Sequence, residues 1–167
     1  NIRGMALIGG TVYVTNSGTA NGAPGAAIVC FDTAGNYQFH FTTTTTSSSP
    51  FSVMAFQGDI LVASSTAAND VHRYTTAGVS VGLFHDSASL AFAHQLAPAS
   101  DGNVWCGGFT TGGIVKLDAT TGALISSFPA SGCRGVYELA NGNILWTSSA
   151  GAFVYNVTTS TSSMVVS

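Results

Sequence analysis

A repeated turn-and-strand pattern constrains this fold more than any other feature of the chain. Four apolar runs, at 11–14, 59–62, 103–106 and 143–146, each follow a tight Gly-containing turn. The turn glycines Gly10, Gly58, Gly102 and Gly142 are 48, 44 and 40 residues apart. Each run is apolar at three successive positions, which is typical of a strand buried on both faces. A lone sheet cannot bury both faces, so the pattern predicts sheets stacked against one another.

A second signature follows each apolar run. A turn residue is found at Gly35, Gly78, Gly122 and Ser160. Six residues after these positions come Phe41, Phe84, Phe128 and Val166. The constant offset indicates four short strands in each repeat, and units of about 40 residues with four strands are typical of β-propeller blades. No segment shows a helical period with helix caps. We therefore predict an all-β fold, a β-propeller of four-stranded antiparallel blades, with four blades visible.

The repeats divide residues 1–167 into one propeller segment with blades at 1–50, 51–93, 94–132 and 133–167. Two short motifs resemble known propellers. The run Tyr13-Val14-Thr15-Asn16 resembles the YVTN repeat of secreted bacterial propellers, and 101–105 (DGNVW) resembles the D-G-x-x-W element of NHL-type and virginiamycin B lyase-like propellers. This resemblance implies the fold but no activity.

The resemblance also implies closure with six or seven blades, whereas four are visible. Three alternatives follow: a piece of a longer propeller of six to eight blades, completion by another chain, or closure with four blades alone. Because a blade without a neighbour exposes a large apolar face, the first two are favoured. The start at Asn1, without an initiator Met, favours a processed or excised piece.

Composition excludes several classes of function. Only 7% of the residues are charged, and the net charge is −3. A nucleic-acid binder needs a basic surface to replace counterions, and a surface held to anionic lipid needs clustered lysines. No apolar run is long enough to span a membrane. Ser and Thr supply 40 residues, so the polar surface is built from hydroxyl groups rather than charges.

One repeat position carries the candidate binding residues. The start of the first strand in each blade is expected at the rim of the central channel, on the side that carries the long loops. Aligned by the turn glycine, this position is occupied by Arg3, Phe51, His94 and Arg134. Arg3, His94 and Arg134 could bind an anionic or carbonyl-bearing ligand, or they could lock neighbouring blades together. Phe109, in a Gly-rich loop, is a candidate contact for a carbohydrate or protein ligand.

The cysteines, histidines and acids give little sign of chemistry. Cys106 and Cys133 are expected on the loop-rich side of adjacent blades and are a candidate disulfide in an oxidising compartment. No spacing indicates a metal site, and no cofactor is predicted. His72 aligns with a core column, while His40 and His85 are expected in solvent. Aspartates at 32, 59, 101 and 118 belong to turns.

No catalytic residue is assigned. Glu138 could face the channel and is the one acid of interest. A virginiamycin B lyase-like enzyme, which by resemblance would use His and Glu with magnesium, or a lactonase-like enzyme is an alternative function. A carbohydrate-binding propeller is a second alternative.

Two segments are candidates for glycosylation. Asn156 begins the only N-x-S/T sequon. The hydroxyl run that includes Thr42, Thr43, Thr44, Thr45 and Thr46 is a candidate for O-linked sugar. Together these observations predict a non-enzymatic, secreted or cell-surface propeller that acts as a scaffold, assembly or binding module. Its expected partners are proteins, including copies of itself or another chain that completes the propeller, and glycans.

Overall fold

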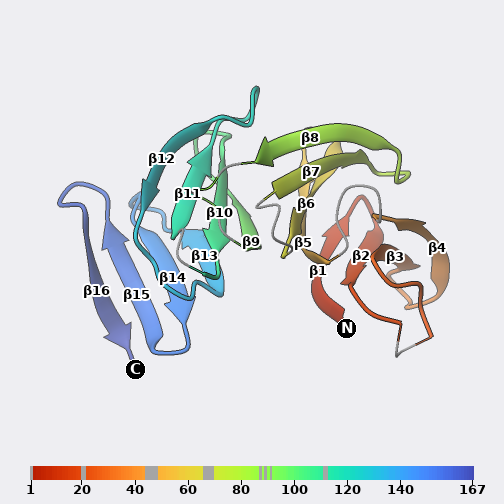
Figure 1. Cartoon of the computed structure of the whole chain (residues 1–167), viewed down its shortest axis with the longest axis horizontal. Coiled ribbons are helices and arrows are strands. Elements are labelled where there is room, and N and C mark those ends of the chain that lie inside the picture. Colours follow the sequence, from red (N-terminus) through yellow and green to blue (C-terminus); the bar gives the residue numbers. More distant parts are fainter. Residues whose placement is uncertain are drawn as a thin grey trace. The chain divides into compact units, whose positions relative to one another are not determined.

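The computed structural model describes residues 2–19, 22–43, 49–65, 70–86, 88, 90, 92–110 and 113–167. Within these residues the secondary structure is entirely strands and turns, and sixteen strands form four four-stranded sheets (Figure 1). In every sheet the strands follow chain order and neighbouring strands are antiparallel. The predicted all-β architecture of four-stranded propeller blades is confirmed.

The strand bounds follow the repeat. The first sheet contains β1 (Ile2–Ile8), β2 (Thr11–Asn16), β3 (Ala27–Asp32) and β4 (Tyr37–Thr42). The second contains β5 (Pro50–Phe56), β6 (Asp59–Ser64), β7 (Asp70–Thr75) and β8 (Ser80–Asp86). The third contains β9 (Ala93–Pro98), β10 (Val104–Gly108), β11 (Ile114–Leu117) and β12 (Leu124–Phe128). The fourth contains β13 (Gly135–Glu138), β14 (Ile144–Ser148), β15 (Gly151–Asn156) and β16 (Thr161–Val166).

Local chemistry explains the tight turns. Gly10, Gly58, Gly102 and Gly142 all have φ between 81° and 85°, a region that glycine enters without steric cost. At the turns between third and fourth strands, a side-chain oxygen caps the backbone. Asp32 Oδ1 accepts from the amides of Ala34 and Asn36, and Asp118 Oδ1 accepts from those of Thr120 and Thr121. These are the predicted Asx turns.

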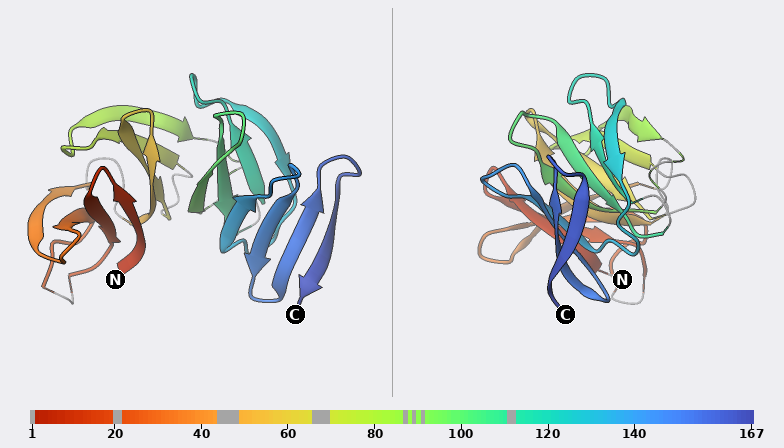
Figure 2. Two further views of the ribbon diagram at one scale, coloured as in Figure 1. Left: turned by 180° about the vertical axis from the view of Figure 1, so that it is seen from behind. Right: turned by 90° about the vertical axis from the view of Figure 1, so that its left-hand side faces the viewer.

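The chain divides into two compact units, 1–86 and 87–167, each made of two sheets. In the first unit β1 lies beside β5, and in the second β9 lies beside β13, so the first strands of neighbouring blades meet (Figure 2). The core of each unit is the layer between its two sheets. Tyr13, Ile28 and Ile60 belong to that layer in the first unit, and Trp105 and Ile144 in the second.

The six-residue offset of the repeat has a structural cause. In the first unit Phe41, at the end of β4, packs on Tyr74 of β7 with ring centroids 5.4 Å apart. In the second unit Phe128, at the end of β12, stacks on Tyr155 of β15 with centroids 3.8 Å apart. The outer strand of one blade therefore places an aromatic ring on the third strand of the next blade. Such a pair stabilises the interface beyond the area that it buries.

A buried hydroxyl joins the two blades of the first unit. Thr15, at the end of β2, is fully buried. Its Oγ1 accepts a hydrogen bond from the Gly4 amide (2.8 Å) and lies within donating distance of the Phe51 carbonyl of the next blade (3.0 Å). The close approach of the blades requires a glycine at position 4, because a Cβ there would lie 2.5 Å from the Phe51 carbonyl oxygen.

We expect Thr15→Val to lower the free energy of unfolding by about 1–3 kcal/mol, because it leaves buried backbone groups without a partner while keeping the shape of the side chain. Urea unfolding followed by circular dichroism measures this loss. Thr33→Val is the control, because Thr33 is exposed in the turn after β3 and its side chain makes no hydrogen bond within the described residues. Equal effects of the two changes would contradict the assignment.

Candidate functional site

The two arginines that the sequence predicted for the channel rim each lie over an aromatic ring of a neighbouring blade. In the first unit the Arg3 guanidinium carbon is 4.9 Å from the centroid of Phe51, which begins the next blade. In the second unit the Arg134 guanidinium carbon is 5.3 Å from the centroid of Phe109, which follows β10 of the preceding blade. Both contacts have the geometry of a cation–π interaction. The repeat position therefore carries a blade-to-blade contact in each unit.

An aromatic cluster supports Arg134 in the second unit. The rings of His94 and Phe109 are stacked with centroids 5.3 Å apart, and Phe92 contacts both, at 6.3 Å from His94 and 5.5 Å from Phe109. The Phe109 amide donates to the Phe92 carbonyl at 3.0 Å, which fixes the loop after β10. Phe92 has φ of 58°, a costly conformation for a bulky residue. Three rings and one guanidinium are thus held in one place.

Three of the four predicted binding residues come together here. His94, Phe109 and Arg134 form one cluster. The repeat alignment had assigned His94 and Arg134 to the same position. Arg3 belongs to the first unit, where it contacts Phe51. Arg134 is exposed, and its guanidinium makes no ion pair or hydrogen bond to any residue in the described part of the chain. Such a group can hold neighbouring blades through the ring and still offer N–H donors to a carboxylate or carbonyl group.

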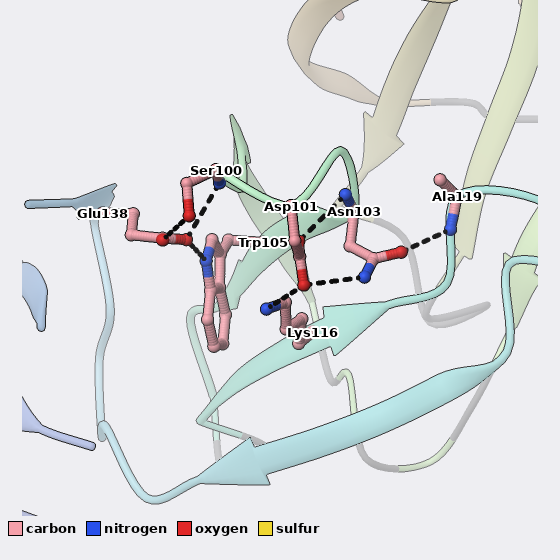
Figure 3. A network of polar contacts seen from close by, with 7 residues as sticks. All are labelled: Ser100, Asp101, Asn103, Trp105, Lys116, Ala119 and Glu138. Atoms are coloured by element: carbon pink, nitrogen blue, oxygen red, sulfur yellow. Dashed lines mark hydrogen bonds and ion pairs between the residues drawn. The ribbon is translucent and has the colours of Figure 1, made fainter. Parts of the chain in front are cut away.

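The opposite end of the same two blades is joined by Glu138 (Figure 3). Its carboxylate accepts hydrogen bonds from the indole Nε1 of Trp105 (2.7 Å), from the Ser100 amide (3.3 Å) and from the Ser100 hydroxyl. Ser100 and Trp105 belong to the third blade and Glu138 to the fourth. The acid that the sequence suggested for the channel is therefore engaged in a contact between blades.

A lysine extends this network. Lys116 Nζ pairs with Asp101 Oδ2 at 2.8 Å and lies 5.1 Å from the centroid of the Trp105 ring (Figure 3). Asp101 also caps its own turn through the Asn103 amide. In the first unit, Arg73 repeats this arrangement with Asp59 and Phe56. The only lysine of the sequence and one of its three arginines therefore form ion pairs and ring contacts within their own blades.

Burial alone would raise the pKa of the Glu138 carboxyl, but the hydrogen bonds from Ser100 and Trp105 outweigh it, and this pKa lies below its usual value. Because folding lowers the pKa, the carboxylate stabilises the fold above the unfolded-state pKa of about 4.3, and this stabilisation is lost as pH falls through the folded-state pKa.

We therefore expect Glu138→Gln to lower the free energy of unfolding at pH 7 by about 1 kcal/mol, and the difference from wild type to shrink as pH falls below about 4. Urea titrations from pH 7 to pH 3 measure both effects. Asp86→Asn is the control, since the exposed Asp86 makes no side-chain hydrogen bond in the described part of the chain. A pH-independent difference for Glu138→Gln would rule out the charged hydrogen bonds as its cause.

We expect Arg134→Ala to cost roughly 0.5–1 kcal/mol of stability through loss of the contact with Phe109. Arg134→Lys keeps the charge and should recover part of the loss, and the double variant Arg134→Ala with Phe109→Leu gives the coupling between the two side chains. Thermal unfolding of wild type, Arg134→Ala, Phe109→Leu and the double variant measures the coupling, and Arg134→Lys is compared with them. Additive losses would show that Arg134 does not hold the blades through this ring, leaving ligand binding as its predicted role.

The three cysteines are free and buried. Cys133 lies against Gly107, where a Cβ would come within 2.6 Å of its sulfur, so Cys133 is on the side of β10 that Trp105 also faces. Successive residues of a strand point to opposite faces, which directs Cys106 to the other side of the sheet. This orientation argues against the predicted disulfide. Burial raises the pKa of the Cys30 thiol to about 11 and that of Cys133 to about 12.

The candidate glycosylation residues are in different environments. Asn156 ends β15 and its Oδ1 accepts from the amides of Thr158 and Thr159, so the sequon lies in an exposed turn. Thr42 is exposed at the end of β4, but Thr43 is fully buried and its hydroxyl donates to the Ala26 carbonyl. Thr43 is therefore not an accessible acceptor. Thr44, Thr45 and Thr46 lie outside the described residues.

Sequence reasoning missed one residue of the site and misjudged the burial of one histidine. Phe92 joins the cluster of His94, Phe109 and Arg134, although no repeat position marked it. His85, expected in solvent, is buried.

The described residues include no group of three His, Cys, Asp or Glu side chains that could hold a metal ion. They also include no helix with the length and apolar composition to cross a membrane.

Comparison with solved structures supports the fold. The sequence matches no model of a known protein family, and no curated protein matches it. A catalytically inactive virginiamycin B lyase from Staphylococcus aureus, solved with quinupristin, matches with a TM-score of 0.70 at 13% identity, over 97% of this chain and 54% of the lyase. The WD40 propeller domain of Doa1 matches with a TM-score of 0.71 at 12% identity, over 96% of this chain and 52% of that domain.

A third similar structure is the extracellular domain of a one component system from Bacteroides thetaiotaomicron. Its TM-score is 0.71 at 17% identity, and the match covers all of this chain and 22% of that one. This chain therefore has the blade architecture of β-propellers, and it spans about half the length of the lyase and WD40 structures that it matches. The lyase-like, lactonase-like and carbohydrate-binding alternatives stay predictions.

Proposed function

We propose that this chain is a non-enzymatic, extracellular propeller segment that acts as a scaffold or assembly module, because its first and last blades each present a face made for another blade. The observation that carries the proposal is the last blade. Every residue of β15 is half-buried, whereas its counterpart β11 is buried except at Lys116. In β14 only Ile144 and Trp146 are buried, while every residue of β10 is buried.

The exposed side of this blade is apolar. Trp146 and Phe153 pack toward the third blade, so the residues next to them along each strand point the other way. We define the last-blade face by these residues, which are mostly apolar: Tyr137, Leu145, Thr147, Ala152, Val154, Ser163 and Val166. None of them is charged, and Tyr137 and Val166 are 62% and 63% exposed. An uncharged face of this kind is typical of a contact surface.

The first blade has a corresponding outward side. Tyr13, Ile28 and Cys30 pack toward the second blade. The residues on the opposite side form the first-blade face: Met5, Leu7, Val12, Val14, Val29 and Phe31. Met5 and Leu7 are 69% and 64% exposed. Val12 and Phe31 are half-buried, and Val14 and Val29 are buried, so the open part of this face lies over β1. Both end blades therefore carry apolar surface where a neighbouring blade would pack.

The use of the acids supports a role without catalysis. Five of the seven acids have structural roles, since Asp32 and Asp118 cap turns, Asp59 and Asp101 pair with cations, and Glu138 joins two blades, whereas the exposed Asp86 has no such role within the described residues. General acid–base chemistry needs a carboxyl group that is available to a substrate. The extracellular location is proposed from the Ser- and Thr-rich, charge-poor composition and from the similar extracellular domain of Bacteroides thetaiotaomicron.

We expect the purified chain to sediment as a species larger than its 16.9 kDa monomer in analytical ultracentrifugation, because both faces are costly to leave in water. Val154→Thr combined with Val166→Thr should shift the distribution toward monomer without loss of the folded signal. Val81→Thr is the control, on the outer strand β8 of an inner blade, where the side chain is 54% exposed. A stable monomer with both faces intact would contradict the proposal.

A further inference from the structure

The first blade contains an open groove on its outward side. It has a volume of about 390 Å³, with Val29 and Phe31 of β3 on its floor, Tyr37 and His40 of β4 on one wall, and the loop residues Ala23 and Pro24 on the other. The loop is tied down by a hydrogen bond from Asn16 Nδ2 to the Pro24 carbonyl at 2.9 Å. Tyr37 and His40 are joined by a 2.8 Å hydrogen bond. The groove therefore has fixed walls and an apolar floor.

The repeat identifies what such a groove receives. Phe31 occupies the same repeat position as Tyr74 and Tyr155. In each unit that tyrosine is covered by the phenylalanine that ends the outer strand of the preceding blade, Phe41 on Tyr74 and Phe128 on Tyr155. Phe31 is half-buried and has no such partner among the described residues. The groove is thus the receiving half of the contact that joins the blades within each unit.

The last blade carries the other half of this contact. Val166 has the repeat position of Phe41 and Phe128 and ends the outer strand β16. Its Cα partner is Ala152, which places Val166 on the last-blade face with Val154. It is 63% exposed in a strand whose other residues are mostly Ser and Thr. An exposed apolar side chain at this position matches the apolar floor of the groove.

We propose that a second copy of this chain docks head to tail, with Val166 of its last blade in the Phe31 groove of the first copy. This proposal rests on the proposed assembly function and names the partner and the contact. The two faces differ from each other, so the contact is heterologous, and it leaves one face of each kind on the resulting pair. Neither face carries a charged residue that would need burial. The proposed contact between copies repeats the contact that the chain already makes within each unit, Phe41 on Tyr74 and Phe128 on Tyr155.

Site-specific cross-linking tests this contact. A chain with Phe31→Cys is mixed with a tagged chain carrying Val166→Cys and treated with a short bismaleimide reagent. The native cysteines serve as an internal background, because they are buried and their raised pKa values keep the thiols protonated. We expect the band on a denaturing gel to shift from one chain mass to the mass of one tagged and one untagged chain.

Met164→Cys is the matched control for Val166→Cys. Met164 lies two residues away on β16 and is 50% exposed. A register shift between Ala152 and Phe153 interrupts the alternation of side chains, so Met164 pairs with Phe153 and points to the side of the sheet opposite Val166. It should give no shift. If Phe31→Cys does not fold, Tyr37→Cys replaces it, since Tyr37 borders the same groove and is 56% exposed. Circular dichroism verifies the fold of each variant before mixing.

Three results would overturn the proposal. One is the absence of a cross-link between Val166→Cys and both groove variants. Another is equal cross-linking by Met164→Cys. The third is a link within one chain when Phe31→Cys and Val166→Cys are combined, which would mean that the chain closes on itself. If the chain still sediments above monomer mass in the first case, the assembly function stands and only this contact is wrong; a monomer would remove both.

Discussion

The structure depends on packing the second and third strands of each blade against a neighbouring blade. A four-stranded sheet covers none of its own faces, so a blade gains most of its stabilisation from the neighbour on either side. The second unit shows the difference directly. On the side of β14 and β15 that faces the third blade, Ile144 and Trp146 are buried, whereas Leu145 and Val154 on the other side are only partly covered. The number of blades and the binding of a partner therefore have the same physical basis, which is the cover that a blade needs on each face.

The repeat preserves the position of a blade contact more strictly than its chemistry. Tyr13 and Trp105 share a position on the second strand, and both donate a hydrogen bond to the next blade, Tyr13 to the Thr76 carbonyl and Trp105 to the Glu138 carboxylate. Thr15 and Gly107 also share a position. The hydroxyl of Thr15 joins two blades, while at Gly107 the space is filled by the sulfur of Cys133. Different side chains thus achieve the same close approach.

Patterns with a local cause were predictable from the sequence. The glycine turns, the capping of turns by Asp32 and Asp118, and the order of four strands per blade depend on residues close together in the chain. Side-chain partners from different blades were not predictable in the same way. Glu138 was singled out as an acid, but its bonds to Trp105 and Ser100 connect residues 33 and 38 positions apart. The D-G-x-x-W motif around Trp105 could have indicated a buried indole N–H that needs a hydrogen-bond acceptor.

The sequence by itself determined the architecture, because the spacing of glycines and apolar runs allows only short antiparallel strands buried on both faces. It also determined which residues share a repeat position, including Arg3 with Arg134 and Phe41 with Phe128. Only the tertiary structure decided what those positions do. It set Arg134 on Phe109, directed Cys106 and Cys133 to opposite sides of a sheet, buried Thr43, and left the Phe31 groove open. The physical reason is that a repeat fixes height and direction along a strand, while the partner of a side chain is set by the packing of a neighbouring blade.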